Sequence, residues 1–246
     1  MATPITWRRF TPAWTCADGS EAGACHIAAR LGCAAAIASS PVLRRVFTRA
    51  AWLRLAAHAL AMTPMALLAH DAFNAQLGAD PVAAITHATG DWALRLLLAT
   101  LAVTPLRRVT GWAWLTGYRR MLGLHAFAYA CAHLATYLVL DLGGYWAQIF
   151  DDIVKRPFIT VGFLAWLCLV PLAATSTRAA MRRLGRRWGQ LHRLIYPIAG
   201  LAVLHFLWLV KSDLREPLIY AGVLALLLAA RAHRALRSRP VQRGGE

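Results

Sequence analysis

The sequence predicts an all-α integral membrane protein, a bundle of six transmembrane helices with both chain termini in the cytoplasm. Three observations lead to this prediction. Apolar residues make up 59% of the 246 positions and the mean hydropathy is +0.47, more than a soluble domain of this length requires. The apolar residues gather in runs long enough for membrane spans. The charged residues, 15% of the chain, lie mainly between these runs, where they set the orientation of a membrane protein.

The strongly basic balance of the chain does not indicate nucleic-acid binding. A net charge of +16 and an isoelectric point near 11.1 would suit a nucleic-acid partner. The arginines, however, stand in blocks between apolar runs and form no continuous face, so we expect the lipid bilayer as partner and no nucleic acid. The five cysteines form no CxxC pair, which argues against a zinc site, an iron–sulfur site or a disulfide framework.

The chain divides by composition into three parts. Residues 1–43 mix small and polar residues with little periodicity, and we interpret them as an N-terminal extension that is disordered or not essential to the fold. Residues 44–236 form the expected transmembrane domain, and residues 237–246 a basic cytoplasmic tail. Several apolar runs fall short of the roughly 20 residues that cross a bilayer, so neighbouring residues must complete them. The expected spans cover residues 51–69, 92–106, 121–140, 158–174, 189–210 and 217–231.

The arginines predict the orientation of these spans. They are concentrated before the first span, between the second and third, between the fourth and fifth, and after the sixth. Positive charge stays on the cytoplasmic side, so both termini are predicted to be cytoplasmic, and the third and fifth spans run parallel from inside to outside. We expect residues 85–90 to form an outer loop in which His87 caps a helix or contacts a partner.

Five of the nine histidines fall inside the expected spans. Ionisable side chains at membrane depth are candidates for function, and neutral imidazole is a good axial ligand for haem iron. These histidines are His58, His125, His133, His192 and His205.

Depth in the membrane sorts three of the histidines into two levels. His133 lies 13 residues beyond Arg120 and His205 lies 18 beyond Arg187, or roughly 20 and 27 Å along a helix. These two can share an outer haem, whereas His192 is close to the cytoplasmic face and can serve an inner one. Thirteen residues place His192 and His205 on different faces of an ideal helix, and we expect Pro197 to re-phase it.

The partner of His192 at the inner level remains open from the residues alone. His125 is at a suitable depth, or is a polar packing residue. Arg119 stands 14 residues before His133, where a second ligand would be expected; arginine is a poor iron ligand but a good partner for haem propionates. His58 could bind a quinone or flavin, or pair with a backbone carbonyl.

A series of motifs resembles the MsrQ (YedZ) family over about residues 50–236, in the family's order. They include Leu77-Gly78-Ala79-Asp80-Pro81, His87-Ala88-Thr89-Gly90, Arg119-Arg120-Met121-Leu122-Gly123, Thr175-Ser176-Thr177, Trp188-Gly189-Gln190-Leu191-His192 and His205-Phe206-Leu207-Trp208. The resemblance implies a ferric-reductase-like transmembrane domain in the bacterial inner membrane, with haem b (one or two) and FMN as cofactors. It also implies that His133, His192 and His205 are haem ligands, while His125 lies outside the family pattern.

The same resemblance implies a direction of electron transfer. Electrons come from the quinone pool or a cytosolic flavin reductase and go to the periplasmic molybdopterin subunit MsrP, which repairs oxidised methionines in proteins. The chain would then be an electron-transfer subunit with no catalytic residue of its own. We expect Asp141, Asp151 and Asp152, in the outer loop after the third span, to help dock that subunit.

Two other functions have less support from the residues. A stand-alone ferric or quinone reductase fed by NAD(P)H needs a nucleotide-binding domain, and the chain has no GxGxxG motif. A non-redox transporter usually pairs histidines with acids inside its spans, and the expected spans hold no Asp or Glu in their cores.

Overall fold

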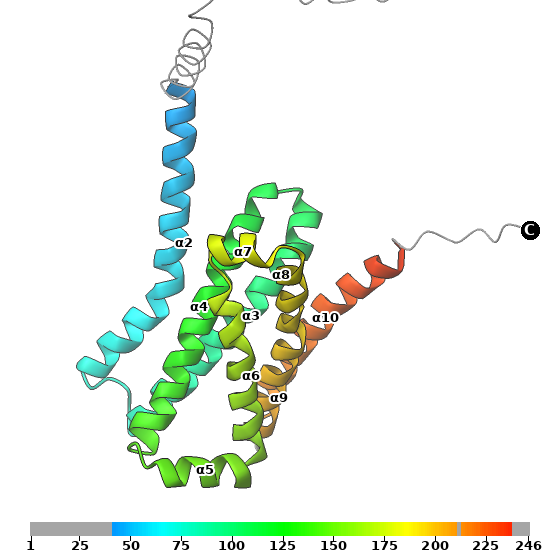
Figure 1. Ribbon diagram of the computed structural model, residues 1–246. Helices are drawn as coiled ribbons and strands as arrows, with labels where there is room; N and C mark the ends of the chain where they lie inside the picture. The colour runs from blue at the N-terminus through cyan, green and yellow to red at the C-terminus, as the bar shows by residue number, and fades with distance from the viewer. Residues whose placement is uncertain (1–40, 211–212, 238–246) are drawn as a thin grey trace, which may run out of the picture. The chain divides into compact units, whose positions relative to one another are not determined.

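The computed structural model describes residues 41–210 and 213–237, and every regular element in these ranges is a helix (Figure 1). The predicted extension, except for its last three residues, and nearly all of the predicted tail lie outside the described residues. Residues 1–55 and 56–246 are separate compact units, and the architecture below is that of the second. The larger helices are α2 (Pro41–Phe73), α3 (Pro81–Thr110), α4 (Thr116–Ala135), α5 (Trp146–Lys155), α6 (Pro157–Ala174), α7 (Arg178–Leu184), α8 (Arg186–Leu191), α9 (Ile195–Leu209) and α10 (Arg215–Arg237).

Five stretches of helix in the described residues are long and apolar enough to cross a membrane, and each covers one of the expected spans to within one residue. They are Ala51–Phe73, Ala113–Asp141, Pro157–Ala174, Arg186–Leu209 and Arg215–His233. The remaining expected span, 92–106, lies within α3, which is 30 residues long but is not among the five. Charged residues such as Asp91 and Arg95 lower the hydropathy of this helix.

Helix α3 begins eleven residues before the expected start, and its capping residues explain both of its ends. The Asp80 carboxylate accepts a hydrogen bond from Ala83 N at 2.9 Å, and Pro81 suits the first helical turn. Gly111, at φ +74°, ends the helix in the left-handed conformation that glycine adopts without strain. The prediction that His87 lies in an outer loop was therefore wrong, because the Asp80 cap starts the helix before it.

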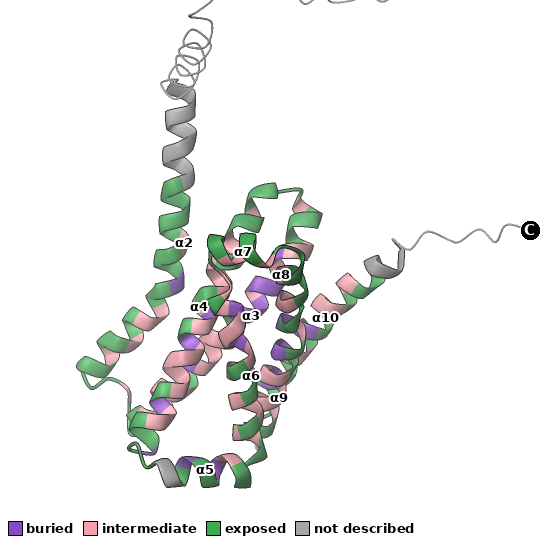
Figure 2. Cartoon of the chain, in the orientation of Figure 1, coloured by how far each residue is buried: buried purple, intermediate pink, exposed green. Residues whose placement is uncertain are grey.

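The core of the bundle gathers around α3. Eight of its residues are buried, and it packs along α4 and also contacts α9 and α10. Leu101 of α3 and Ala199 of α9 are fully buried at 0% exposure, and Figure 2 shows buried residues concentrated on the inner helix faces. Large apolar residues on the outward faces, such as Leu167 and Leu226, are exposed and suit contact with lipid.

The fifth expected span contains an irregular turn between His192 and His205. Helix α8 ends at Leu191, a 3₁₀ turn η3 covers His192–Leu194, and α9 begins at Ile195. Pro197 lies in the first turn of α9, where its missing N–H removes no hydrogen bond from the helix. The change of phase therefore lies at the 3₁₀ turn, which ends three residues before Pro197 and has fewer residues per turn than an α-helix, and not at Pro197 as predicted.

Tyr129 of α4 repairs a defect in the backbone of α2. Pro64 interrupts α2, and next to it the Tyr129 hydroxyl donates to Ala61 O at 3.0 Å and accepts from Met65 N at 3.0 Å. The hydroxyl thus stands between a donor and an acceptor that a regular helix would join directly. Only 1% of Tyr129 is exposed, so no water can take its place.

We expect Tyr129→Phe to lower the free energy of unfolding by about 1–3 kcal/mol, because it leaves a buried backbone N–H and C=O without partners. Thermal unfolding in detergent measures the effect. Tyr145→Phe is the matched control, since Tyr145 is 72% exposed. Equal stability of the two variants would contradict the bridging role of Tyr129.

Candidate functional site

Helices α4 and α9 run in the same direction, and each carries a histidine towards the end of the bundle that α5 covers (Figure 1). We call this the α5 end. The ends of α3, α6 and α10 and the beginnings of α4 and α8 lie at the opposite end, which we call the arginine-rich end. His133 lies on α4 and His205 on α9, and the structure brings the two rings together at a centroid distance of 6.2 Å. The rings are nearly perpendicular, at an interplanar angle of 78°.

A backbone carbonyl of a neighbouring helix orients each of these rings. His133 Nδ1 lies 2.9 Å from Thr86 O of α3, and His205 Nδ1 lies 2.7 Å from Phe158 O of α6. A carbonyl only accepts, so each Nδ1 carries the proton and donates it. Each Nε2 then keeps a lone pair for a ligand or metal.

The two histidines are held in equivalent ways by two different helix pairs. The donor and the acceptor are 47 positions apart in the sequence in both cases. One helical turn after each accepting carbonyl stands a glycine, Gly90 on α3 and Gly162 on α6. The α3–α4 pair and the α6–α9 pair therefore present a histidine by the same device.

The glycines provide the space in which the imidazoles lie. A Cβ atom on Gly162 would lie 2.7 Å from Nδ1 and 2.8 Å from Cε1 of His205. A Cβ atom on Gly90 would lie 3.0 and 3.1 Å from the same atoms of His133. Any side chain at these positions would push the rings away from their carbonyl acceptors.

Both histidines line one cavity of about 570 Å³, a size typical of sites for small molecules and cofactors. Its walls come from α3, α4, α5, α6 and α9 and are mostly apolar. The apolar lining includes Leu94, Leu97, Ala126, Ala130, Leu134, Ile149, Ile153, Phe163, Ala165, Leu169, Ile198, Ala202 and Phe206. In the described residues no group of three or more His, Cys, Asp or Glu side chains could hold a metal ion. Two facing imidazoles in an apolar cavity instead suit a metal whose other ligands arrive with a cofactor.

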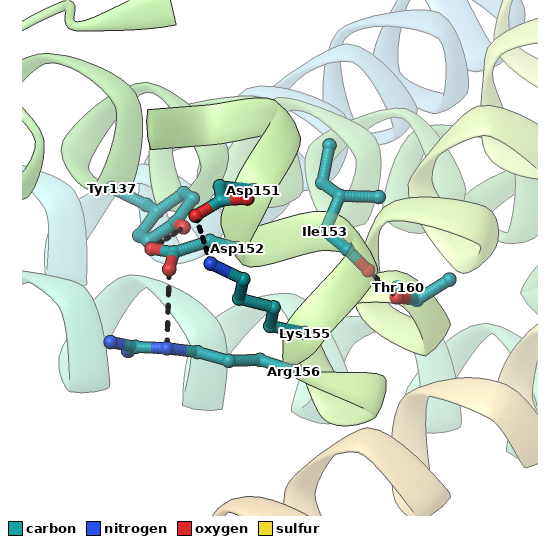
Figure 3. A network of polar contacts seen from close by, with 7 residues as sticks. All are labelled: Tyr137, Asp151, Asp152, Ile153, Lys155, Arg156 and Thr160. Atoms are coloured by element: carbon teal, nitrogen blue, oxygen red, sulfur yellow. Dashed lines mark hydrogen bonds and ion pairs between the residues drawn. The ribbon is translucent and has the colours of Figure 1, made fainter. Parts of the chain in front are cut away.

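A polar network closes the α5 end of the cavity (Figure 3). The last turns of the third span are π-helical over Thr136–Asp141, and Tyr137 there donates to Asp152 Oδ2 at 3.0 Å. Asp152 also pairs with Arg156 at 3.3 Å, and Thr160 donates to Ile153 O. Tyr137 and Arg156 both line the cavity, so the network joins the π-helical segment, α5 and α6 at its mouth.

The predicted acidic docking loop is less acidic at its surface than the sequence indicates. Asp152 is only 8% exposed and serves the network under α5. Asp151 pairs with Lys155 one turn later, although its side chain remains exposed. Asp141 is exposed at the end of the π-helical segment. Asp152 is therefore a structural residue, and of the three predicted docking residues only Asp141 and Asp151 are exposed.

His192 lies at the arginine-rich end, apart from the cavity. Its Nδ1 hydrogen-bonds to Trp188 O at 3.1 Å, and the two rings stack at 4.0 Å. Its Nε2 is buried and makes no hydrogen bond of good geometry to the described residues, although the backbone of Leu172 lies near the ring. Arg119 is half-buried near the start of α4, close enough to His192 to interact with it electrostatically. The structure therefore places these two predicted site residues in one region.

The remaining two predicted site residues form a separate pair. The rings of His58 on α2 and His125 on α4 lie 5.1 Å apart, and His125 Nδ1 donates to Met121 O one turn earlier. Neither lines the cavity of His133 and His205.

Comparisons with known proteins agree with this arrangement. A family described as "Ferric reductase like transmembrane component" matches residues 89–203, the stretch from α3 to α9 that surrounds the cavity. A relative from Xanthomonas campestris pv. campestris (strain 8004), named "Protein-methionine-sulfoxide reductase heme-binding subunit MsrQ", is 62% identical over 192 residues. The match covers 76% of this chain and 88% of the relative. The chain belongs to the MsrQ family.

Other MsrQ relatives show the same extent of similarity. One from Xanthomonas oryzae pv. oryzae (strain MAFF 311018) is 62% identical, and the match covers 74% of this chain and 86% of the relative. One from Rhodospirillum rubrum is 50% identical, and the match covers 76% of this chain and 90% of the relative. No solved structure matches the chain. Its apolar helices and its ferric-reductase-like transmembrane family make it a multi-pass membrane protein.

Sequence reasoning in this MsrQ chain found the histidines but missed what holds them. Thr86 and Phe158 act through backbone carbonyls, which carry no signal of residue type. Gly90 and Gly162 did leave a signal, because glycine inside a predicted helix usually has a packing reason. The helix that each glycine faces could be identified only in the folded chain.

We expect Gly162→Ala to destabilise the chain by about 1–3 kcal/mol, because the new methyl group overlaps the His205 ring. Gly200→Ala on α9 is the matched control, since a Cβ there meets nothing within 4 Å. It should stabilise the helix by up to about 1 kcal/mol. Thermal unfolding in detergent compares the two, and equal gains in stability would contradict the packing of Gly162 against His205.

Proposed function

We propose that the chain binds haem b between His133 and His205 and passes electrons across the membrane to a protein-methionine-sulfoxide reductase. The observation that carries this proposal is the pair of facing imidazoles in one apolar cavity, each with its Nδ1 bound to a backbone carbonyl. The relatives' printed name, a heme-binding subunit of such a reductase, supports both the cofactor and the process.

The distance between the rings fits a shared iron. Two metal–imidazole bonds of about 2 Å each, extended to the ring centres, separate those centres by about 6 Å. The observed separation is 6.2 Å. When bound, haem supplies an iron that carries single electrons by alternating between its ferric and ferrous states.

The protein contributes orientation and exclusion of water. The Thr86 and Phe158 carbonyls fix the tautomer in which each Nε2 is free to coordinate, and they make the imidazoles more basic. The apolar walls lower the local dielectric, a property that tunes the reduction potential of a bound cofactor. The Tyr137–Asp152–Arg156 network closes the mouth of the cavity next to α5.

We propose His192 as a ligand of a second, inner haem, with Arg119 as a partner for its propionates. The buried and unpartnered His192 Nε2 supports this assignment, because such an atom is costly unless a ligand occupies it. FMN remains a further proposed cofactor, by resemblance to the family. We assign His58 and His125 to packing, since His125 binds its own helix.

We also propose that the arginine-rich end faces the cytoplasm, with the α5 end in the periplasm of a bacterial inner membrane. The positive-inside rule supports this orientation. This orientation requires α3 to cross the membrane in addition to the five stretches named above, which gives six spans. It places both termini in the cytoplasm. The 30 residues of α3 are sufficient for a crossing, and its burial among other helices compensates for its lower hydropathy. We further propose residues 44–236 as the transmembrane domain, residues 1–43 as an extension that is not essential to the fold, and residues 237–246 as a basic cytoplasmic tail.

Electrons then enter at the arginine-rich end and leave at the α5 end. We propose the quinone pool or a cytosolic flavin reductase as donor and the molybdopterin subunit MsrP as acceptor. Thirteen residues separate His192 and His205, about 20 Å along a straight helix. This separation places the inner and outer cofactors at different depths, as a transmembrane path requires.

Replacing either facing histidine tests the haem assignment. We expect His133→Ala and His205→Ala each to lose the outer haem, and His125→Ala to retain it. Haem per purified chain and the reduced-minus-oxidised spectrum measure the loss. The nearly perpendicular rings also predict a strongly anisotropic low-spin ferric signal in electron paramagnetic resonance. Full haem content in both variants, or its loss in His125→Ala alone, would overturn the ligand assignment.

Charge reversal on the α5 side tests partner docking. We expect Asp141→Lys with Asp151→Lys to slow electron transfer to the reductase by about tenfold at low ionic strength, because both carboxylates are exposed. The effect should fade as salt is added. Asp152→Asn is the control for a buried acid and should lower thermal stability instead. A rate that is unchanged at low salt would contradict docking at this surface.

A further inference from the structure

Arg231, near the end of α10, binds a backbone carbonyl that a proline leaves without its usual partner. Its Nη2 donates to Leu101 O of α3. In a regular helix Leu101 O would accept from the N–H of residue 105, but that residue is Pro105, which has none. An unsatisfied carbonyl at membrane depth is costly, and the bond from Arg231 Nη2 to Leu101 O avoids this cost. The role of one of the two terminal nitrogens of the guanidinium is thereby explained.

The other half of the guanidinium has no partner. Arg231 Nη1 is buried and makes no hydrogen bond to the described residues. The guanidinium carbon lies 5.3 Å from the centre of the Tyr196 ring, and a hollow of about 280 Å³ opens beside the two side chains. No carboxylate among the described residues forms an ion pair with Arg231.

Other cations lie in the same part of the bundle. Arg119 and Arg108 are both close enough to Arg231 to interact with it electrostatically. A partly buried cation among other cations is unfavourable unless an anion joins them. The hydrogen-bonding geometry of a guanidinium suits carboxylate and phosphate oxygens.

Arg231 and His192 belong to the same region. Tyr196, whose ring lies 5.3 Å from the guanidinium carbon of Arg231, follows His192 by four residues, and Arg119 is near both side chains. His192 Nε2 and Arg231 Nη1 are also the two buried side-chain nitrogens left without a partner in the described part of the chain. One ligand with a metal centre and an anionic edge would satisfy both atoms.

We propose that Arg231, together with Arg119, is the anion site that holds the carboxylates of the cofactor bound by His192. This inference rests on the proposed inner haem and adds a residue of the last helix to its site. Arg231 is a positioning residue with two tasks, because one nitrogen satisfies Leu101 O and the other faces the ligand. The phosphate of FMN or of an anionic lipid has related chemistry and is distinguished by the test below.

The test must separate the two tasks of Arg231. In Pro105→Ala the chain regains a backbone N–H for Leu101 O, so adding Arg231→Met removes the anion contact without leaving that carbonyl unsatisfied. Pro105→Ala alone is the reference. Arg231→Lys retains the charge, and Arg193→Met removes an exposed arginine next to His192 as the matched control.

We expect the double variant to lower the midpoint potential of one haem, because losing a cation near the carboxylates favours the ferric form. Spectroelectrochemistry of the full-length protein should show that this is the haem lost in His192→Ala, with the His133–His205 haem unchanged. The midpoint potential of this haem in Arg231→Lys should remain close to that of the wild type. In Arg193→Met it should equal that of the wild type.

Other results overturn the inference in recognisable ways. Unchanged potentials in the double variant exclude the anion site. Loss of bound flavin assigns Arg231 to an FMN phosphate, and loss of lipid phosphorus assigns it to a headgroup. If His192→Ala retains every haem, the proposed inner haem itself fails, whatever Arg231 does.

Discussion

The hydrogen bond from a histidine Nδ1 to a carbonyl of the next helix is the interaction on which the rest of the site depends. It fixes the tautomer of His133 and His205, leaves each Nε2 with a free lone pair, and holds the two rings 6.2 Å apart beside their shared cavity. It also explains the two glycines, because a ring that reaches a backbone carbonyl must lie against that backbone. Gly162 leaves the space that any side chain would fill.

Proline raises a related problem at other places in the bundle, and distant side chains solve it. Next to Pro64, the Tyr129 hydroxyl bridges Ala61 O and Met65 N. Four residues before Pro105, Leu101 O accepts a hydrogen bond from Arg231. In water such groups would be hydrated, but within a membrane the protein must satisfy them itself. These repairs tie α4 to α2 and α10 to α3, and they place polar groups close to the proposed cofactor levels.

Charge divides the bundle along its length. The arginine-rich end collects cations without matching acids, whereas the α5 end pairs its acids locally, as Asp152 does with Arg156. This asymmetry gives orientation by the positive-inside rule and, in our proposal, an anion site at one end and a docking surface at the other. It also separates buried charges that serve structure, such as Asp152, from charges that remain exposed, such as Asp141.

The sequence by itself determined the helical class, five of the spans and which histidines lie inside the spans. It could do so because apolar runs, and ionisable residues within them, are local signals. Local signals also mark the start of α3, where Asp80 caps the helix before Pro81, but the sequence prediction placed that start at residue 92 and was wrong. Only the tertiary structure decided that His133 and His205 face each other, that Gly90 and Gly162 make room for them, and that Arg231 reaches Leu101. These pairings join residues far apart in the chain, and backbone carbonyls leave no trace in residue identity.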